Sequence, residues 1–322
     1  MPLIKLGHKE TVLLTPEAPY NFNASFHKPS HFPSSDDFWE EDKFWITMLW
    51  KGQELGLKFE NMGTIDRPEI KLDIYSEEEL SKEYLDSLIP EIRWRFNFDS
   101  DISEFHQKFK DDQVLGPIIE KWKGMKPVAA NSIYEILMIY IVLQNATVRR
   151  SVQMLENLFE RFGNSLEYDG KTLSVFWEPE RIAESSEQDL RDLKVGYRAK
   201  FIMKITEQFV NKEIDEFVLR KMSREEVRNE MLKLYGIGPA SVEYLLFDDF
   251  YFYGVLETIP PWEQKIMSRL IFNDNLVAPE KVFGFFRKFE GWEKLAFHYI
   301  WEDIFWKRKY EHIEWLEKEI RL

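Results

Sequence analysis

The chain has 322 residues, 44% of them hydrophobic and 31% charged, which is typical of a soluble globular protein with enough material for a large core. It contains no cysteine, which excludes disulfides, thiolate nucleophiles and cysteine-ligated zinc or iron–sulfur clusters. Its net charge of −14 argues against nucleic-acid binding, and no apolar stretch reaches the length of about 18 residues that a membrane span needs.

The first part of the chain shows the alternation of apolar and polar residues that is typical of β-strands. The segment FWITMLWKGQELGLKFE, with a turn at Lys51-Gly52-Gln53, predicts a β-hairpin, and EIKLDIYS alternates again. From Ser76 the spacing becomes helical, and SEEELSKEYLDSLI has the acidic first turn of a helix. We therefore predict an α+β fold, with an antiparallel β domain and a connecting helix over residues 1–100 and a mostly α-helical domain over residues 101–322.

The second part of the chain predicts mainly helices. The segment SIYEILMIYIVLQN, Ser132 to Asn145, is apolar nearly all round and is expected to be a buried central helix. The next helix is expected to end at Gly163, before a small hairpin, LEYDGKTLSVFW, that turns at Asp169-Gly170. Ser223 and Glu226 have the spacing of a capping box. The last long stretch, from GWEKLAF to the end, fits one or two helices.

A glycine-rich turn, Gly236-Ile237-Gly238, separates two helical patterns in LYGIGPASVEYLL, and Pro239 begins the second pattern. The glycines permit backbone angles that other residues resist, and Ile237 would tuck between the helices. The first N–H groups of the second helix and its positive dipole end suit a phosphate, so such a site needs no Lys or Arg. An ordinary connection between two helices, with a glycine as the C-cap of the first, is an alternative interpretation of the same motif.

Several segments in a fixed order resemble the helix–hairpin–helix DNA glycosylases, in the branch of the 8-oxoguanine and alkyladenine enzymes. They are ISEFHQKFKD, IYEILMIYIVLQNATVRRSVQMLENLFERFG, LRDLKVGYRAKFI, LYGIGPASVEYLL with IPPWEQKIMSRL, and KVFGFFRKFEGWEKLAFHYIWEDIF. The resemblance extends from about residue 10 to residue 306 and includes the antiparallel sheet before the helical domain. It implies base-excision repair, in which a damaged base is flipped out of the stack and its N-glycosidic bond is cut.

The family's catalytic carboxylate, an Asp at the start of the helix after the hairpin, has no Asp counterpart here. That region reads Ile259-Pro260-Pro261-Trp262-Glu263. Glu263 occupies the position in the alkyladenine-type register, whereas Trp262 falls there in the 8-oxoguanine-type register. Glu has the required carboxylate, on a side chain one methylene longer than that of Asp. The alternative is that Glu263 is an ordinary acidic residue in the first turn of a helix, where it interacts favourably with the helix dipole. Asp248 and Asp249 are fallback carboxylates, otherwise solvated charges at a helix end.

Bifunctional members of the family carry a Lys just after the hairpin, which attacks the sugar as an amine. Ala240 stands at that position here, so the resemblance implies a monofunctional enzyme with water as the nucleophile. It also ranks alkylated purines such as 3-methyladenine above 8-oxoguanine as substrates.

DNA contacts are expected from three places besides the hairpin. Gln144-Asn145 matches the family's position for a polar side chain that fills the gap left by the flipped base, and Arg149 follows it. Between Arg191 and Lys204 five basic residues face one acid, a local charge of +4. The residues that the resemblance places against DNA are Gln144, Asn145, Arg149, Tyr197, Arg198, Gly236, Ile237, Gly238, Ala240 and Lys265. A polar C-cap at Gln144 and a solvated face at 191–204 are the alternatives.

The base pocket should offer stacking rings, and motif position selects Tyr244, Phe297 and His298, with Trp122, Tyr134 and Trp301 as weaker candidates. The six His show no metal-ligand spacing, so no catalytic metal or other cofactor is expected. The family's hairpin often binds a monovalent cation through backbone carbonyls, which would be structural.

The expected partner is double-stranded DNA that contains a damaged base, and the expected protein is a cytoplasmic monomer, nucleoid-associated in a prokaryote. Two other functions remain open at this level. A lesion-binding or abasic-site-binding protein with the same fold and no catalysis is supported by the missing Asp. An acidic helical protein without a role on DNA would show no salt-sensitive DNA binding.

Overall fold

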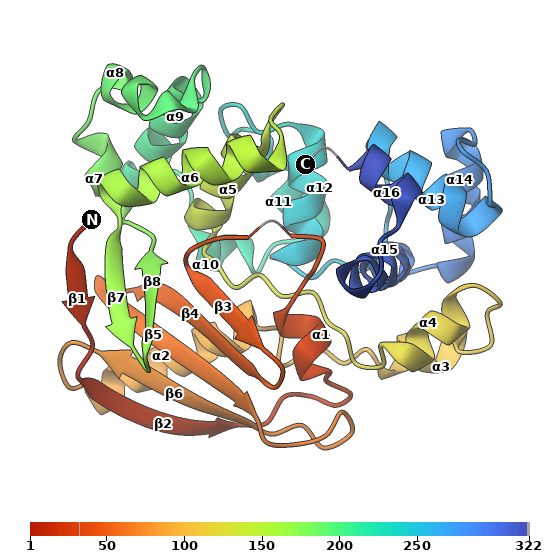
Figure 1. Cartoon of the computed structure of the whole chain (residues 1–322), viewed down its shortest axis with the longest axis horizontal. Helices are drawn as coiled ribbons and strands as arrows, with labels where there is room; N and C mark the ends of the chain where they lie inside the picture. The colour runs from red at the N-terminus through yellow and green to blue at the C-terminus, as the bar shows by residue number, and fades with distance from the viewer. Residues whose placement is uncertain (32, 321–322) are drawn as a thin grey trace.

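The computed structural model describes residues 1–31 and 33–320 and confirms the α+β architecture. An antiparallel five-stranded sheet has the strand order β2-β6-β5-β4-β3, and helices make up most of the remainder (Figure 1). Its strands are β2 (His8–Leu14), β3 (Asp37–Glu40), β4 (Lys43–Trp50), β5 (Gln53–Asn61) and β6 (Ile70–Ser76). Among the described residues no helix is both long enough and apolar enough to cross a membrane.

The predicted hairpin is confirmed as β4 and β5, with a tighter turn than expected. Trp50 pairs with Gln53, so the loop contains only Lys51 and Gly52. Both have positive φ, 47° and 77°, as two-residue hairpin turns require. Gln53 is therefore the first residue of β5 and not part of the turn.

A second, three-stranded sheet joins the N-terminus to a hairpin from the middle of the chain. Strand β1 (Leu3–Lys5) is parallel to β7 (Asn164–Tyr168), which is antiparallel to β8 (Lys171–Val175). The β7–β8 hairpin turns at Asp169-Gly170 as predicted. The Asp169 carboxylate accepts hydrogen bonds from Trp45 Nε1 at 2.8 Å and Tyr75 Oη at 3.1 Å. These contacts fasten the hairpin to the five-stranded sheet.

The helices follow the predicted order. They are α1 (Phe22–Phe26), α2 (Lys82–Arg95), α3 (Ser103–Phe109), α4 (Leu115–Lys121), α5 (Ile133–Leu143), α6 (Val148–Phe162), α7 (Pro179–Ala183), α8 (Glu187–Leu190), α9 (Arg198–Val210), α10 (Glu216–Leu219), α11 (Arg224–Met231), α12 (Pro239–Asp248), α13 (Pro261–Phe272), α14 (Pro279–Phe286), α15 (Glu293–Tyr310) and α16 (Glu314–Glu319). A π-helical turn (Arg191–Val195) precedes α9, and a 3-10 turn (Arg287–Phe289) follows α14.

Local signals set several helix ends as predicted, and one predicted start is wrong. Ser223 and Glu226 form the expected capping box of α11, and Gly163 is the C-cap of α6. Helix α2, however, begins at Lys82 and not near Ser76, because Ser76 still pairs with His8 in the sheet. Ser81 supplies the N-cap by accepting a hydrogen bond from the Tyr84 N–H at 3.1 Å.

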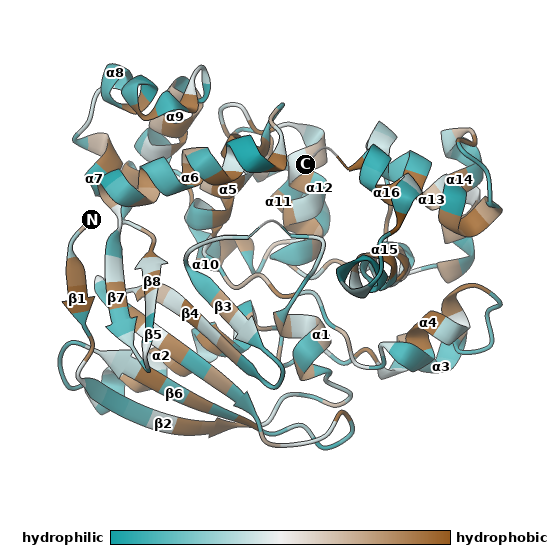
Figure 2. Cartoon of the chain, viewed as in Figure 1, coloured by the Kyte–Doolittle hydropathy of each residue, from teal (hydrophilic) through white to brown (hydrophobic). Residues whose placement is uncertain are grey.

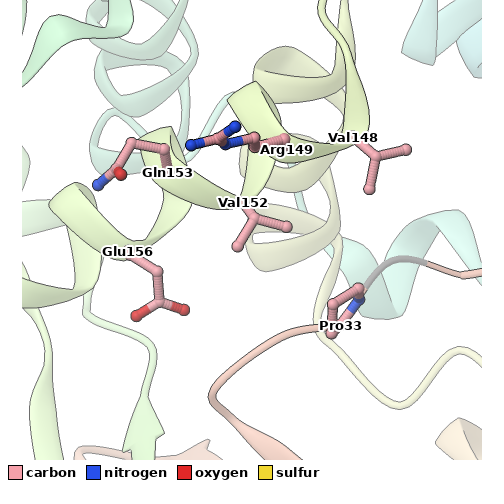
Figure 3. Close-up of a pocket in the computed structure, with 6 residues that line it drawn as sticks. All are labelled: Pro33, Val148, Arg149, Val152, Gln153 and Glu156. Atoms are coloured by element: carbon pink, nitrogen blue, oxygen red, sulfur yellow. The ribbon is translucent and has the colours of Figure 1, made fainter. Parts of the chain in front are cut away.

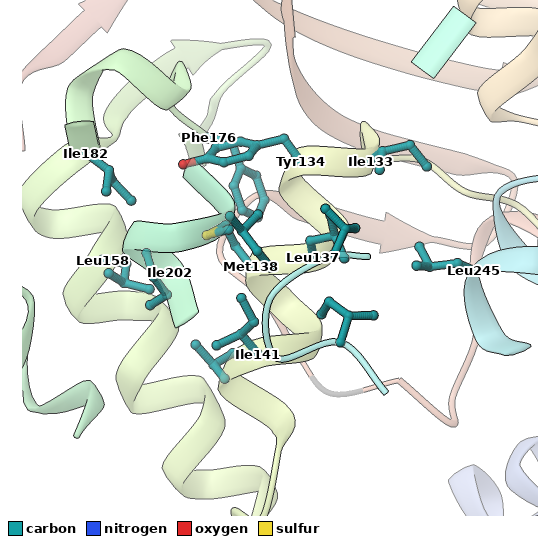
Figure 4. Packing of buried hydrophobic residues seen from close by; sticks show 14 of the residues in the cluster. Ile133, Tyr134, Leu137, Met138, Ile141, Leu158, Phe176, Ile182, Ile202 and Leu245 are labelled. Atoms are coloured by element: carbon teal, nitrogen blue, oxygen red, sulfur yellow. The ribbon is translucent and has the colours of Figure 1, made fainter. Parts of the chain in front are cut away.

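Three main hydrophobic clusters hold these elements together. One lies between the five-stranded sheet and helices α1 and α2, and one surrounds α5. Figure 4 shows Leu137, Met138 and Ile141 of α5 packed beside Leu158 and Ile202, which confirms α5 as a buried central helix. The third cluster joins α3 and α4 to α13, α14 and α15. In Figure 2, α5 is mostly brown, whereas α6 is largely teal on its visible side.

Candidate functional site

The glycine turn joins α11 to α12 in the expected helix–hairpin–helix arrangement. Gly236 has a φ of +84°, and a Cβ on it would approach the Phe201 ring to 2.7 Å. Ile237 is buried in the cluster around α5. Within the described residues, the N–H groups of Gly238, Ala240 and Ser241 donate to no protein acceptor. They are free for an anion at the positive end of α12.

The loop after α5 reaches this hairpin directly. Gln144 Nε2 donates to the Gly236 carbonyl at 2.8 Å, so this amide positions the hairpin. Asn145 is exposed, and its Nδ2 lies 3.4 Å from Tyr197 Oη. Tyr197 is 44% exposed. Of the two amides expected to enter the DNA, that of Asn145 is the more exposed and lies beside an exposed ring, whereas Gln144 is half-buried and bonded to the hairpin.

Arg198 is not exposed at the surface, where a contact with a DNA phosphate would be made. Its side chain is buried, with the residue 7% exposed. The guanidinium donates to the carbonyl oxygens of Ile141 at 3.1 Å, Val195 at 3.4 Å and Gln144. A cation suits this position because the carbonyls at a helix C-terminus carry partial negative charge. Arg198 therefore holds the end of α5, and its guanidinium is turned away from solvent in the free protein, so its contact with DNA stays a prediction.

The expected charge of +4 over 191–204 is also reduced. Arg191 pairs with Glu187 at 2.5 Å and Lys204 with Glu207 at 2.7 Å, both on the surface. With Arg198 buried, Lys194 and Lys200 are the basic residues of this segment that pair with no carboxylate in the described chain. Arg191 and Lys204 thus fit the alternative in which this segment is an ordinary solvated helix face.

Two other expected DNA contacts lie on the surface. Arg149 is exposed on the first turn of α6, where it lines an open hollow of about 400 Å³ (Figure 3). Pro33 and Glu156 line the same hollow, which contains none of the candidate catalytic residues. Lys265 on α13 pairs with Glu319 at 3.1 Å.

Polar side chains line the facing sides of α12 and α15. Positions i, i+4 and i+8 of a helix share one face. On α12 this row is Ala240, Tyr244 and Asp248, which begins at the hairpin, and on α15 it is Lys294, His298 and Glu302. Lys294 Nζ lies 5.1 Å from the centroid of the Tyr244 ring, so the two rows meet. With Glu263 of α13, we name Tyr244, Asp248, Glu263, Lys294, His298 and Glu302 the polar cluster.

Glu263 is a buried carboxylate that is held by another member of the polar cluster. It is 3% exposed, Tyr244 Oη donates to its Oε1, and its Oε2 has no protein partner. Burial raises the pKa of Glu263, while the charge of Lys294 and the Tyr244 hydrogen bond act in the opposite direction. Trp262 instead is 41% exposed and packs on Trp301. The structure thus places Glu263, and not Trp262, beside the α12 row.

The deeper part of the polar cluster also contains unsatisfied groups. Burial and the charge of Lys28 lower the pKa of His298 well below its usual value, and its Nε2 has no protein partner. Ser30 Oγ donates to Glu302 Oε1 at 2.5 Å, and burial raises the pKa of Glu302 to about 7. Such groups in a buried site point to a bound water or ligand.

The two fallback carboxylates are not solvated charges. Asp248 pairs with Lys28 at 3.6 Å, and both side chains are largely shielded from solvent. Asp249 is buried, which raises its pKa well above the usual value, and its Oδ2 has no protein partner. The end of α12 lies against the N-terminal segment. Tertiary packing therefore shields Asp248 and Asp249 from solvent, although their sequence position suggested solvated charges at a helix end.

Among the other ring candidates, most belong to the core. Phe297 is buried and stacks on Trp301 with centroids 6.0 Å apart, although Lys294 Nζ lies 5.1 Å from its ring. Tyr134 bonds to Thr206 Oγ1 at 2.9 Å, and Trp122 Nε1 donates to Asp303 at 2.7 Å. Tyr244 and His298 are the rings that belong to the polar cluster. The described residues contain no group of three or more His, Asp and Glu side chains placed to hold a metal ion.

Lys294 and Glu302 are the residues of the polar cluster that sequence reasoning missed, and Lys294 is the one beside Tyr244. Lys294 stands in GWEKLAFHYI, four residues before His298 and eight before Glu302, on the same face of α15. That spacing was the available signal, because a lysine on the buried face of a helix is rare unless it has a partner. Lys294 adds a buried ammonium to a polar cluster whose buried carboxylates are Glu263 and Glu302.

Comparisons with known proteins agree with this geometry. A family model described as HhH-GPD superfamily base excision DNA repair protein matches residues 138–319, more than half of the chain. A DNA-3-methyladenine glycosylase from Bacillus subtilis is 24% identical over 189 residues, which span 55% of this chain and 62% of that protein's length.

Solved structures show the same fold. A 3-methyladenine DNA-glycosylase from Archaeoglobus fulgidus has a TM-score of 0.72 at 17% identity, with 91% of this chain and 99% of that chain covered. A Clostridium acetobutylicum 8-oxoguanine glycosylase/lyase, in complex with double-stranded DNA, has a TM-score of 0.66 at 18% identity, with 95% and 99% covered.

Proposed function

Because this chain belongs to the HhH-GPD superfamily of base excision DNA repair proteins, we propose that it is a DNA N-glycosylase that removes a damaged purine from double-stranded DNA. The observation that carries the proposal is the position of Glu263. Glu263 is a buried carboxylate with one oxygen that has no protein partner. It lies beside Tyr244, which belongs to the row of α12 residues that begins at the hairpin. The fold likeness and the names of the relatives support the reaction class.

The hairpin would hold the DNA backbone next to the lesion. The free N–H groups of Gly238, Ala240 and Ser241 donate to a phosphate, which explains how an acidic chain binds DNA without a basic patch. Asn145 and Tyr197 lie near this turn at the surface and would occupy the space that the extruded base leaves. The base itself would stack against Tyr244 and His298.

Glu263 would act on the sugar. As the N-glycosidic bond breaks, its electron pair leaves with the base, and positive charge develops on the sugar, which the carboxylate stabilises. Water then bonds to C1′, Glu263 takes its proton, and the departing base takes up a proton from solvent. The products are the free base and an abasic site.

Water, and not an amine, is proposed as the nucleophile. Ala240 stands exposed in the first turn of α12, where an amine would be needed for a Schiff base. A monofunctional enzyme leaves an abasic site that breaks only after alkali. Borohydride should therefore trap no covalent complex between the wild-type chain and lesion DNA.

The test is single-turnover base release from duplexes with one defined lesion each. The panel is 3-methyladenine, 7-methylguanine, hypoxanthine, uracil and 8-oxoguanine. We expect wild-type protein to release one or more purines, with nicking only after alkali. Glu263→Gln should reduce the rate by about 100-fold or more, because it removes the charge and keeps the shape. Glu257→Gln, at an exposed acid that pairs with Arg224, is the matched control and should not change the rate.

One observation favours a second function. The chain carries Glu263 where the family has Asp. In the free protein, one carboxylate oxygen of Glu263 already accepts a hydrogen bond from Tyr244. A lesion-binding protein without catalysis would show tight, salt-sensitive binding to the same duplexes and no base release from any of them. That outcome would replace the glycosylase proposal, whereas release that is unchanged in Glu263→Gln would contradict only the role of Glu263.

A further inference from the structure

Lys294 is a buried cation without a partner. The residue is 6% exposed, and within the described residues its Nζ makes no hydrogen bond and no ion pair within 4.0 Å. Its surroundings are three ring faces, of Tyr244 at 5.1 Å, Phe247 at 5.8 Å and Phe297 at 5.1 Å. Ring faces attract a cation but accept none of its three N–H bonds as a carbonyl oxygen would.

Of the three carboxylates in the polar cluster, Asp248 makes an ion pair within the described residues, and Glu263 and Glu302 make none within 4.0 Å. Glu263 is the carboxylate on which Lys294 acts, and Asp248 is paired with Lys28 at 3.6 Å. Burial lowers the pKa of His298 well below its usual value and raises the pKa of Glu302 to about 7, so it disfavours the charged form of both. A second cation brought beside Lys294 would therefore meet an ammonium and rings whose faces are already occupied. A neutral group with an oxygen acceptor would satisfy the free donors.

We propose that Lys294 determines which extruded base the site accepts, by donating to the carbonyl oxygen or ring nitrogen of a neutral purine and by disfavouring a purine that carries its own positive charge. This inference rests on the proposed base-release function and concerns its substrate. 7-Methylguanine in DNA is cationic, whereas 8-oxoguanine and hypoxanthine are neutral; all three present a carbonyl at C6, so charge is what distinguishes them. Lys294 thus reverses the ranking that the sequence resemblance implied.

A simpler role for Lys294 is to keep Glu263 ionised. The two roles differ in their consequences. Loss of an electrostatic partner of Glu263 would slow release of every base by the same factor and would shift the pH profile upwards. Loss of a base-reading donor would change the ratio of rates between neutral and cationic lesions.

The experiment compares wild type, Lys294→Met and Lys294→Arg on duplexes that carry 8-oxoguanine, hypoxanthine or 7-methylguanine. Met keeps the length and packing of the side chain but has neither the charge nor the N–H donors. Arg keeps the charge and the N–H donors. Single-turnover release is measured across pH for each duplex. We expect wild type to favour the neutral purines over 7-methylguanine by about 10-fold or more, Lys294→Met to reduce this ratio by about 10-fold, and Lys294→Arg to retain most of it.

Two results would overturn the proposal: a wild-type preference for 7-methylguanine, or an equal loss on all three duplexes in Lys294→Met. If the wild-type chain releases no base at all, the proposed function fails by itself. The same ratio is then read from the dissociation constants of the three duplexes, where Lys294→Met should still reduce the preference for the neutral lesions. An unchanged ratio of dissociation constants would overturn the role of Lys294 in that case too.

Discussion

At the scale of single residues, burial decides what each charged side chain can do. Glu263 and Lys294 are among the most buried charged residues of the chain, whereas Lys265 and Arg149 stay at the surface. Arg198 shows that a basic residue in a DNA-binding motif can serve the fold, since its guanidinium is bonded to three backbone carbonyls. A residue type alone therefore does not assign a role.

The hydrogen bond from Tyr244 to Glu263 should set the acid limit of activity. Because burial raises the pKa of Glu263, the active carboxylate is lost as pH falls through a value above the ordinary Glu pKa, and the rate falls with it. Tyr244→Phe removes a bond that lowers this pKa, so the acid limb should move to higher pH. Single-turnover rates from pH 4 to pH 8 measure the shift.

Tyr140→Phe is the control for that measurement. The Tyr140 ring lies 6.3 Å from that of Tyr244, and its hydroxyl makes no hydrogen bond to Glu263. Its acid limb should coincide with that of wild type. If the two variants shift equally, the hydrogen bond to Glu263 is not the cause.

At the scale of elements, the hairpin combines a conformational requirement with an anion site. Gly236 needs its positive φ and closes against Phe201, while Gly238 has a φ of −102° and open space where a Cβ would lie. The first three free N–H groups of α12 follow directly. The two glycines of one short motif thus have different functions in the fold.

Alanine substitutions should separate the two glycines. Gly236→Ala forces a side chain into the left-handed region and into the Phe201 ring, and should lower the free energy of unfolding by about 1–2 kcal/mol and weaken DNA binding. Gly238→Ala should leave the free energy of unfolding within about 0.5 kcal/mol of wild type. Urea denaturation and DNA titration measure both effects, and equal stability of the two variants would contradict this assignment.

At the scale of the whole molecule, the N-terminal segment and the closing helices share the polar cluster. Ser30 bonds to Glu302 on α15, and Lys28 pairs with Asp248 at the end of α12. Strand β1 likewise pairs with β7, which lies about half-way along the chain. The site is therefore assembled from segments that are far apart in sequence.

Glu302 should make stability depend on pH. Its folded-state pKa of about 7 lies above its ordinary value, so the protonated form favours the folded state. The free energy of unfolding should fall as pH rises from about 5 to 8, by about 2–3 kcal/mol from this group. Glu302→Gln stays neutral and should lack this part of the decline in urea denaturation.

Glu311→Gln, at the exposed end of α15, is the control and should follow wild type across the same range. Parallel curves for wild type and Glu302→Gln would show that Glu302 is not protonated in the folded state.

The sequence by itself determined the features that depend on local spacing. Alternation predicted the β4–β5 hairpin, the capping-box spacing of Ser223 and Glu226 predicted the start of α11, and the spacing in LYGIGPASVEYLL predicted the glycine turn. The apolar character of Ser132 to Asn145 predicted the central helix. These are properties of a few consecutive residues, and their physical causes act over one or two turns of chain.

Only the tertiary structure decided which polar residues form the site. It buried Glu263 and exposed Trp262, one residue apart, because the rotation of α13 against α12 sets which side chain faces inwards. It also brought Lys294 beside Tyr244, removed Arg198 from the surface and buried Asp249. Burial and pairing depend on contacts between distant segments, and no local pattern specifies those contacts.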